Sequence, residues 1–171
     1  MKVVRKQKNS RNCIICGMEN PLGVKAPFYN LDDGSVASIF KFLHEHQSYP
    51  DRTHGGMVCC MLDELIGRAL WVNEPDMYGV TTTLSITYRK PTPYNTLLKG
   101  RGYITHNSKI GFSARGEIYD MDNNLLAEAS GRYFKMTATR AFGDTSHEKD
   151  EMIYDIPDDV KEIDFPEKKN P

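Results

Sequence analysis

The sequence lacks several features that would assign it to a class at once. Neither sign of charge is in excess, since 22 Lys and Arg residues stand against 23 Asp and Glu residues, which argues against a nucleic-acid or anionic-membrane partner. No apolar run is long enough to span a bilayer. The basic N-terminus has no long apolar core of the kind found in signal peptides. We therefore expect a cytoplasmic protein that binds neither nucleic acid nor membrane.

Cysteine is also scarce, with four residues in the chain. Cys59 and Cys60 are neighbours in an apolar stretch, where we expect them to act as small buried hydrophobic residues. Cys13 and Cys16 form one C-x-x-C motif followed by Gly17. A structural zinc site usually needs a second ligand pair, and the sequence offers none. We therefore expect an ordered N-terminal loop without metal, with zinc and a redox dithiol as the alternatives.

The chain is long enough for one domain with a hydrophobic core, since 39% of its 171 residues are hydrophobic. Residues 1–12 have the composition of a polar tail. Residues 141–171 are acidic and poor in core residues, which is typical of an extended tail. The sequence thus predicts a single domain over residues 13–140 between two tails.

One long helical pattern, from residue 55 to about 72, is apolar on most of its circumference, which is typical of a helix enclosed by protein. Strand-like segments precede and follow it, at residues 24–30, 31–43, 79–90, 97–107, 110–122 and 125–136. A single helix has no helical layer to join, so the sheet must curl around it. The sequence predicts an α+β domain in which one long helix is wrapped by a curled antiparallel sheet of about five to six strands.

The start of this helix carries two glycines, Gly55 and Gly56. The first turn of a helix has N–H groups without intrahelical partners and a positive dipole end. Glycines at this position let the oxygen of another molecule approach the backbone, where an oxyanion would be stabilised. The alternative is that both glycines only form a tight turn from loop to helix.

Two acidic residues follow in the middle of the same helix. Glu64 stands four positions before Arg68, the favourable spacing for a solvated ion pair. Asp63 has no such partner within the helix, and an unpaired acid on an enclosed helix is costly unless it is hydrogen-bonded. Desolvation also makes a carboxylate a better base. Asp63 is therefore the candidate for a functional acid.

These residues carry a resemblance to a known family. His54-Gly55-Gly56, followed after six residues by Asp63, resembles the signature of the hotdog-fold acyl-CoA thioesterases, in the phenylacetyl-CoA thioesterase-like branch. Three further segments resemble this family in order and spacing: "CIICGMENPLGVK", "YGVTTTLSITYRKPTP" and "NSKIGFSARGEIYDMDNNLLAEASGRYF". The resemblance covers residues 13 to about 136.

The resemblance implies a hotdog fold and a homodimer, or a dimer of dimers, with active sites at the subunit interface. It implies hydrolysis of an acyl-CoA thioester without cofactor or metal. The N–H of Gly55 or Gly56 would polarise the thioester carbonyl, and Asp63 of the partner subunit would act as general base or nucleophile. His54 would position the loop or substrate, and Thr81 would orient the water.

The sequence departs from the family pattern just before His54, where several members have an Asn or Gln that contacts the thioester or the water. Ser48 occupies that position, and Gln47 precedes it. This departure keeps open a second function, a non-catalytic acyl-CoA-binding protein that acts as a sensor or carrier. The candidate substrate-binding residues, each of which could also be an ordinary surface group, are Gln47, Ser48, Glu64, Arg89, Lys90, Lys109 and Arg132.

Overall fold

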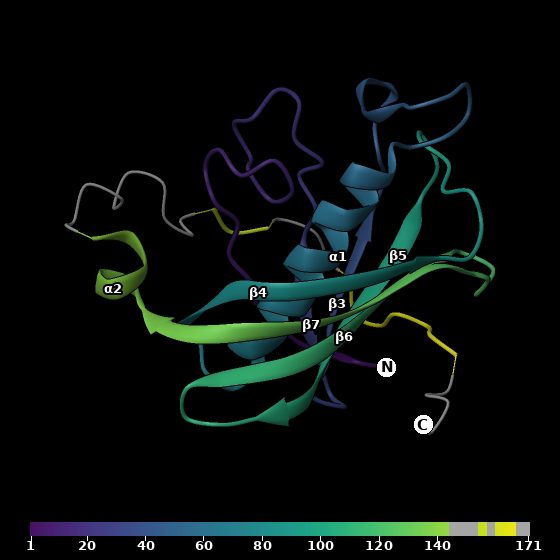
Figure 1. The fold of residues 1–171 in the computed structure, drawn as a ribbon. Helices are drawn as coiled ribbons and strands as arrows, with labels where there is room; N and C mark the ends of the chain where they lie inside the picture. Colours follow the sequence, from purple (N-terminus) through teal and green to yellow (C-terminus); the bar gives the residue numbers. More distant parts are fainter. Residues whose placement is uncertain (144–153, 157–159, 167–171) are drawn as a thin grey trace.

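The computed structural model describes residues 1–143, 154–156 and 160–166 (Figure 1). The strands are β1 (Val3–Gln7), β2 (Phe28–Leu31), β3 (Val36–Phe40), β4 (Met77–Tyr88), β5 (Leu98–Asn107), β6 (Gly111–Asp120) and β7 (Leu125–Thr137). The helices are α1 (Gly55–Ala69), α2 (Ala138–Phe142) and the 3-10 turns η1 (His44–His46) and η2 (Leu70–Val72). The long helix begins at the predicted residue and ends in η2, as its apolar pattern indicated.

All strands join one antiparallel sheet in the order β1-β2-β3-β5-β6-β7-β4. The sheet curls around α1, with β4, β7 and β6 passing across the helix (Figure 1). The predicted α+β hotdog architecture is therefore confirmed. The sheet has seven strands, slightly more than the five to six expected.

The additional strand is β1, which lies in the segment expected to be a polar tail. Its residues pair with β2 from Val3 opposite Leu31 to Gln7 opposite Phe28. The expectation of a tail is wrong for these residues, because Gln7 is buried and its side-chain amide donates to Asn30. A polar residue in this position is satisfied by hydrogen bonds that the composition of the segment does not reveal.

Helix α1 is packed tightly against the concave face of the sheet. Its apolar face is fully buried, with Met61, Leu62, Leu65 and Ile66 inaccessible to solvent. Strand β5 approaches so closely that a Cβ on Gly102 would collide with the backbone carbonyl of Leu65. Glycine at this position lets the helix and the sheet come together, and so fixes where the two ends of the helix lie.

The C-terminal segment also contributes residues to the core, although its composition predicted an extended tail. Ile163 and Phe165 are buried in a cluster with Tyr29 and Tyr119 on the face of the sheet that points away from α1. Closer to the domain, Tyr154 forms an antiparallel bridge with Asn9. Residues 151–153, just before it, lie outside the described ranges. The domain boundaries at residues 13 and 140 stay predictions.

In the described part of the chain, no helix is both long enough and apolar enough to cross a bilayer.

Candidate active site

The N-terminus of α1 is capped by a side chain from the residue before it. His54 accepts a hydrogen bond at Nδ1 from the Gly56 N–H, at 2.9 Å. The Gly55 carbonyl accepts from the Tyr88 hydroxyl, also at 2.9 Å. The Gly55 N–H has no acceptor among the described residues. Of the two glycines, Gly55 therefore has the N–H available to a ligand.

The two glycines also differ in what a side chain would meet. A Cβ on Gly56 would lie 2.9 Å from His54 Nδ1, so the cap requires glycine there. A Cβ on Gly55 would lie 3.4 Å from the nearest atom, the Tyr88 hydroxyl oxygen. Packing within this chain thus tolerates a side chain at Gly55, and the open backbone there leaves room for an approaching group.

Basic side chains surround this helix end. Gly55 lines a hollow of about 310 Å³ together with Arg52, Arg89 and Lys90. Arg89 and Lys90 were predicted to contact substrate, whereas Arg52 was not, because it lies in an irregular loop whose course the sequence did not indicate. The hollow offers cationic groups beside a free backbone N–H, which suits a ligand with anionic and carbonyl groups.

The Asp63 carboxylate is held by hydroxyl groups from two strands. Tyr133 donates to Asp63 Oδ1 at 2.6 Å, and Thr81 donates to the same oxygen at 2.9 Å. Burial, followed by the hydrogen bond to Asp63, raises the pKa of Tyr133, so the phenol stays protonated and acts as a donor. Oδ2 of Asp63 has no donor in the described ranges, and this oxygen is free to take a proton or attack.

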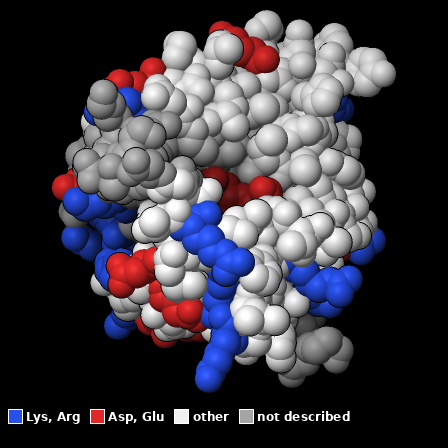
Figure 2. Space-filling model, turned by 60° about the vertical axis from the view of Figure 1, so that its left-hand side comes forward, with Lys and Arg blue, Asp and Glu red and all other residues white. Residues whose placement is uncertain are grey.

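Asp63 borders a second hollow, of about 210 Å³. Its lining consists of side chains from α1, β4 and β7: Asp63, Glu64, Gly67, Arg68, Trp71, Tyr78, Gly79, Thr81 and Tyr133. Figure 2 shows one face of the molecule with acidic side chains recessed in a hollow and Lys and Arg side chains gathered below it.

The two hollows cannot act on one reacting group within a single chain. Gly55 and Asp63 are eight residues apart on α1, which corresponds to about 12 Å at a rise of about 1.5 Å per residue. A carbonyl bound at Gly55 is therefore out of reach of the Asp63 carboxylate of the same subunit.

The ion pair predicted on α1 is present but is not solvated. Arg68 Nε donates to Glu64 Oε1 at 2.7 Å, and the Arg68 side chain is 3% exposed. The guanidinium carbon lies 4.2 Å from the centre of the Phe28 ring, and Nη1 donates to the Gln7 side chain. The N-terminal strand covers this face of the helix, which the expectation of a polar tail had left open to solvent.

The remaining predicted residues do not gather at either hollow. Gln47 accepts from the Tyr94 hydroxyl at 3.1 Å, and Ser48 is exposed in the same loop. Arg132 lies on the face of the sheet that points away from α1, beside Arg115. Lys109 is exposed in the turn between β5 and β6, near the end of α1 opposite Gly55.

Comparison with known proteins agrees with the fold. Residues 52–127 match the family model of the thioesterase superfamily. An uncharacterised protein of Schizosaccharomyces pombe is 28% identical over 114 residues, which span 61% of this chain and 63% of that protein. The crystal structure of a thioesterase superfamily protein superposes with a TM-score of 0.66 and 27% identity, over 72% of this chain and 63% of that chain. The chain thus covers less than two thirds of the length of both proteins.

A further solved structure shares the fold. It is that of a Bacillus halodurans protein with CoA, with a TM-score of 0.59 and 23% identity, over 67% of this chain and 76% of that chain. The matched segment contains α1 with Asp63, and the sheet has the hotdog arrangement. The chain therefore has the hotdog fold, and its residues 52–127 are similar to the thioesterase superfamily, in agreement with its motifs.

Proposed function

We propose that the protein hydrolyses an acyl-CoA thioester to the free acid and CoA as a cytoplasmic homodimer or dimer of dimers. The observation that carries this proposal is the Asp63 carboxylate, held at one oxygen by Tyr133 and Thr81 and free at the other. The catalytic partner of this group is the free Gly55 N–H of a second subunit.

Strand β4 supplies the geometry for this pairing. It is the last strand in the sheet order, with β7 as its one neighbour. The Gly55 hollow lies at the Tyr88 end of β4, and the Asp63 hollow lies at the Thr81 end. A two-fold axis near Ser85 would pair two β4 strands antiparallel and exchange their ends. Each Gly55 would then face the partner subunit's Asp63, and both sheets would join at their edges.

In the proposed reaction, the thioester carbonyl accepts a hydrogen bond from the Gly55 N–H at the positive end of α1, which stabilises the oxyanion. Asp63 Oδ2 either takes a proton from the attacking water or attacks the carbonyl directly. Arg52, Arg89 and Lys90 bind the CoA phosphates, and CoA binding by the Bacillus halodurans protein of the same fold supports this assignment. His54 fixes the turn that leaves the Gly55 N–H free.

A non-catalytic acyl-CoA-binding protein is the second candidate. The Gln47 side chain, which could replace the family's Asn or Gln, is bound to Tyr94. If no other group positions the thioester, the protein would bind acyl-CoA without turning it over, as a sensor or carrier does.

The deciding experiment measures thiol release from acyl-CoA esters with short, medium, long and aromatic acyl groups. Wild type is compared with Asp63→Asn, which keeps the shape of the side chain but removes the base. We expect release by wild type and a loss of at least 100-fold in the variant, because general-base catalysis contributes roughly 10²–10⁴-fold. Equal rates in both proteins would exclude Asp63 from the reaction, and tight binding without release by wild type would favour the second candidate.

A further inference from the structure

The C-x-x-C loop folds so that backbone N–H groups point at one sulfur. The Sγ atom of Cys13 accepts from the Ile15 N–H at 3.3 Å and from the Cys16 N–H at 3.5 Å. The Gly17 N–H closes the turn by donating to the Cys13 carbonyl at 2.8 Å. A Cβ on Gly17 would collide with the Cys13 backbone. N–H donors that converge on a sulfur stabilise a thiolate, which is the form that binds metal.

The two thiols of the loop differ in their exposure to solvent. Cys13 is partly exposed and Cys16 is buried. A metal ion could therefore reach the Cys13 sulfur from solvent, with the second sulfur close beside it.

Helix α1 brings a third ligand to these sulfurs, which the spacing of cysteines in the sequence could not indicate. Glu64 Oε2 lies 3.9 Å from Cys13 Sγ. The ligand atoms of Cys13, Cys16 and Glu64 all lie within 4.8 Å of one another. In a tetrahedral zinc site, Zn–S bonds of about 2.3 Å place two sulfurs about 3.8 Å apart. Small side-chain rotations would therefore bring these three atoms into coordination distance.

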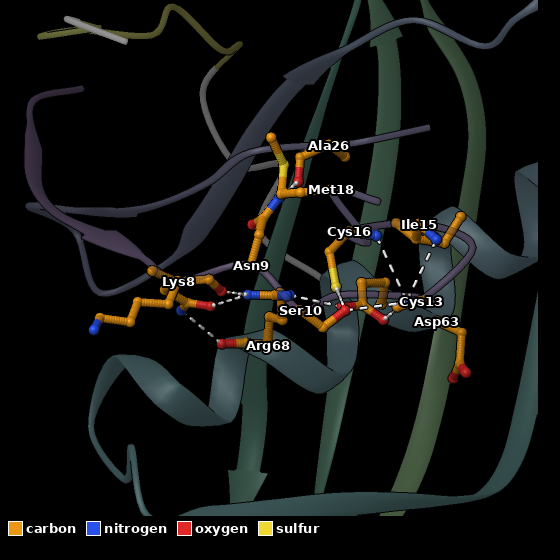
Figure 3. A network of polar contacts seen from close by, with 12 residues as sticks. Lys8, Asn9, Ser10, Cys13, Ile15, Cys16, Met18, Ala26, Asp63 and Arg68 are labelled. Carbon is orange, nitrogen blue, oxygen red and sulfur yellow. Dashed lines mark hydrogen bonds and ion pairs between the residues drawn. The ribbon is translucent and has the colours of Figure 1, made fainter. Parts of the chain in front are cut away.

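Arg68 completes the charge balance of the cluster. Two thiolates and one carboxylate carry three negative charges, and a divalent cation with the Arg68 guanidinium supplies three positive charges. Arg68 donates to Glu64 Oε1, which leaves Oε2 directed at Cys13. Figure 3 shows Cys13, Cys16, Ser10 and Arg68 together, with the Asp63 carboxylate pointing away from the sulfurs. A cation in this cluster would be neutralised without recruiting Asp63.

We propose that Cys13, Cys16 and Glu64 form a binding site for a thiophilic divalent cation, with Zn²⁺ as the best match and a water as the fourth ligand. Two sulfurs and one carboxylate are ligands that Zn²⁺ accepts, whereas Mg²⁺ and Ca²⁺ require oxygen. The metal links the N-terminal loop to α1 next to Asp63, and stabilises the structure around the active site. The site is separate from the proposed hydrolysis, in which Asp63 acts without metal.

The test uses the full chain, reduced with a phosphine and freed of metal with a chelator. Titration with Co²⁺ should give one equivalent of bound metal and a thiolate-to-metal charge-transfer band, and Zn²⁺ should then displace the cobalt. The band should be lost in Cys13→Ser and in Cys16→Ser, and Glu64→Gln should weaken binding at least tenfold. Cys59→Ser, a cysteine of α1 outside the cluster, is the matched control and should bind as wild type.

Two further measurements are independent of activity. Zn²⁺ should raise the melting temperature of wild type and of Cys59→Ser, but not of Cys13→Ser, because binding to the folded state alone shifts the unfolding equilibrium. If the serine variants do not fold, Zn²⁺ should still protect two thiols of wild type from alkylation. The proposal is overturned if reduced wild type takes up no stoichiometric metal, if Cys13→Ser binds as well as Cys59→Ser, or if the chain forms a Cys13–Cys16 disulfide and takes up no metal after reduction.

Discussion

At the scale of the residue, the Asp63 carboxylate accepts two hydroxyl hydrogen bonds on one oxygen and none from the described residues on the other. This asymmetry decides which oxygen can react. Tyr133 and Thr81 fix the orientation of the carboxylate. Hydrogen bonds to a charged group are worth about 1.5–3 kcal/mol each. The second oxygen keeps the lone pairs that a general base or nucleophile needs.

The Tyr133→Phe variant tests this positioning role. It removes the hydroxyl but keeps the ring, which stacks on Phe112. We expect kcat for thioester hydrolysis to fall by about 10- to 100-fold, the loss of one hydrogen bond to a charged group, while KM stays close to the wild-type value.

The control for Tyr133→Phe is Tyr119→Phe. Its hydroxyl donates to Glu117 at 3.0 Å, and its ring packs on the face of the sheet away from α1. We expect wild-type kcat in this control. An unchanged kcat in Tyr133→Phe, or a change in KM alone, would contradict the positioning role.

The sequence identified Asp63 and Thr81 but not Tyr133. Both strands were predicted, and Thr81 was named from the family motif. Tyr133 is 70 positions from Asp63, and its place opposite the acid depends on how β7 lies over the helix. The register of a sheet against a helix comes from tertiary packing, which local patterns in one sequence do not encode.

At the scale of the element, β4 is a long strand with one edge unpaired in the described chain. Eleven of its twelve residues pair with β7 on one side, and the register shifts at Thr82. An edge of this length is a template for pairing with another chain. In this protein the two ends of the edge lie beside the two half-sites, so the proposed dimer and the proposed chemistry depend on the same strand.

The Ser85→Lys variant tests the β4 pairing. A residue near a two-fold axis meets its own copy, and like charges directly opposite each other destabilise a strand pair. We expect the variant to be monomeric in light-scattering measurements and to lose thioesterase activity, because each half-site then lacks its partner.

The matched control is Ser130→Lys on β7. Ser130 pairs with Ser85 inside the sheet and does not lie on the edge strand. The same substitution there should leave the protein dimeric. A Ser85→Lys protein that remains dimeric and active would contradict pairing through this strand.

The elements themselves were largely predictable. The apolar pattern of α1 and the alternation in β4 to β7 follow from residues that are close in sequence. Strand β1 was missed because its alternation consists of Val, Arg, Lys and Gln, which a tail could equally contain. The pairing of β1 with β2 and the burial of Gln7 depend on the rest of the fold.

At the scale of the whole molecule, the chain covers the concave face of its sheet and part of the opposite face. Helix α1 covers the concave face, and the segment 160–166 covers part of the other. Phe165 is 6% exposed and lies over the buried side chains of Lys99 and Arg101. The C-terminal segment therefore contributes to the stability of the domain.

The Phe165→Ala variant tests this contribution. Truncation of a buried phenylalanine lowers the free energy of unfolding by roughly 3–5 kcal/mol. We expect a value near the lower end, because the segment covers only one side of the cluster around Tyr29 and Tyr119. Chemical denaturation monitored by circular dichroism gives the free energy of unfolding.

The control is Glu162→Ala in the same segment. Its side chain is exposed, so the loss should stay below about 0.5 kcal/mol. Equal stabilities of Phe165→Ala and Glu162→Ala would show that the segment does not support the fold.

The distance of about 12 Å between the helix tip and the acid of the same subunit has a genetic consequence. In the proposed dimer, a protomer defective at Asp63 and one defective at Gly55 would each be inactive as a homodimer. When the two are mixed, one site of the heterodimer receives both defects and the other receives neither. Two alleles of this gene, one defective at Asp63 and the other at Gly55, should therefore complement each other in a diploid cell. When subunits assort at random, half of the dimers are heterodimers with one intact site each, so the activity should reach at most a quarter of normal.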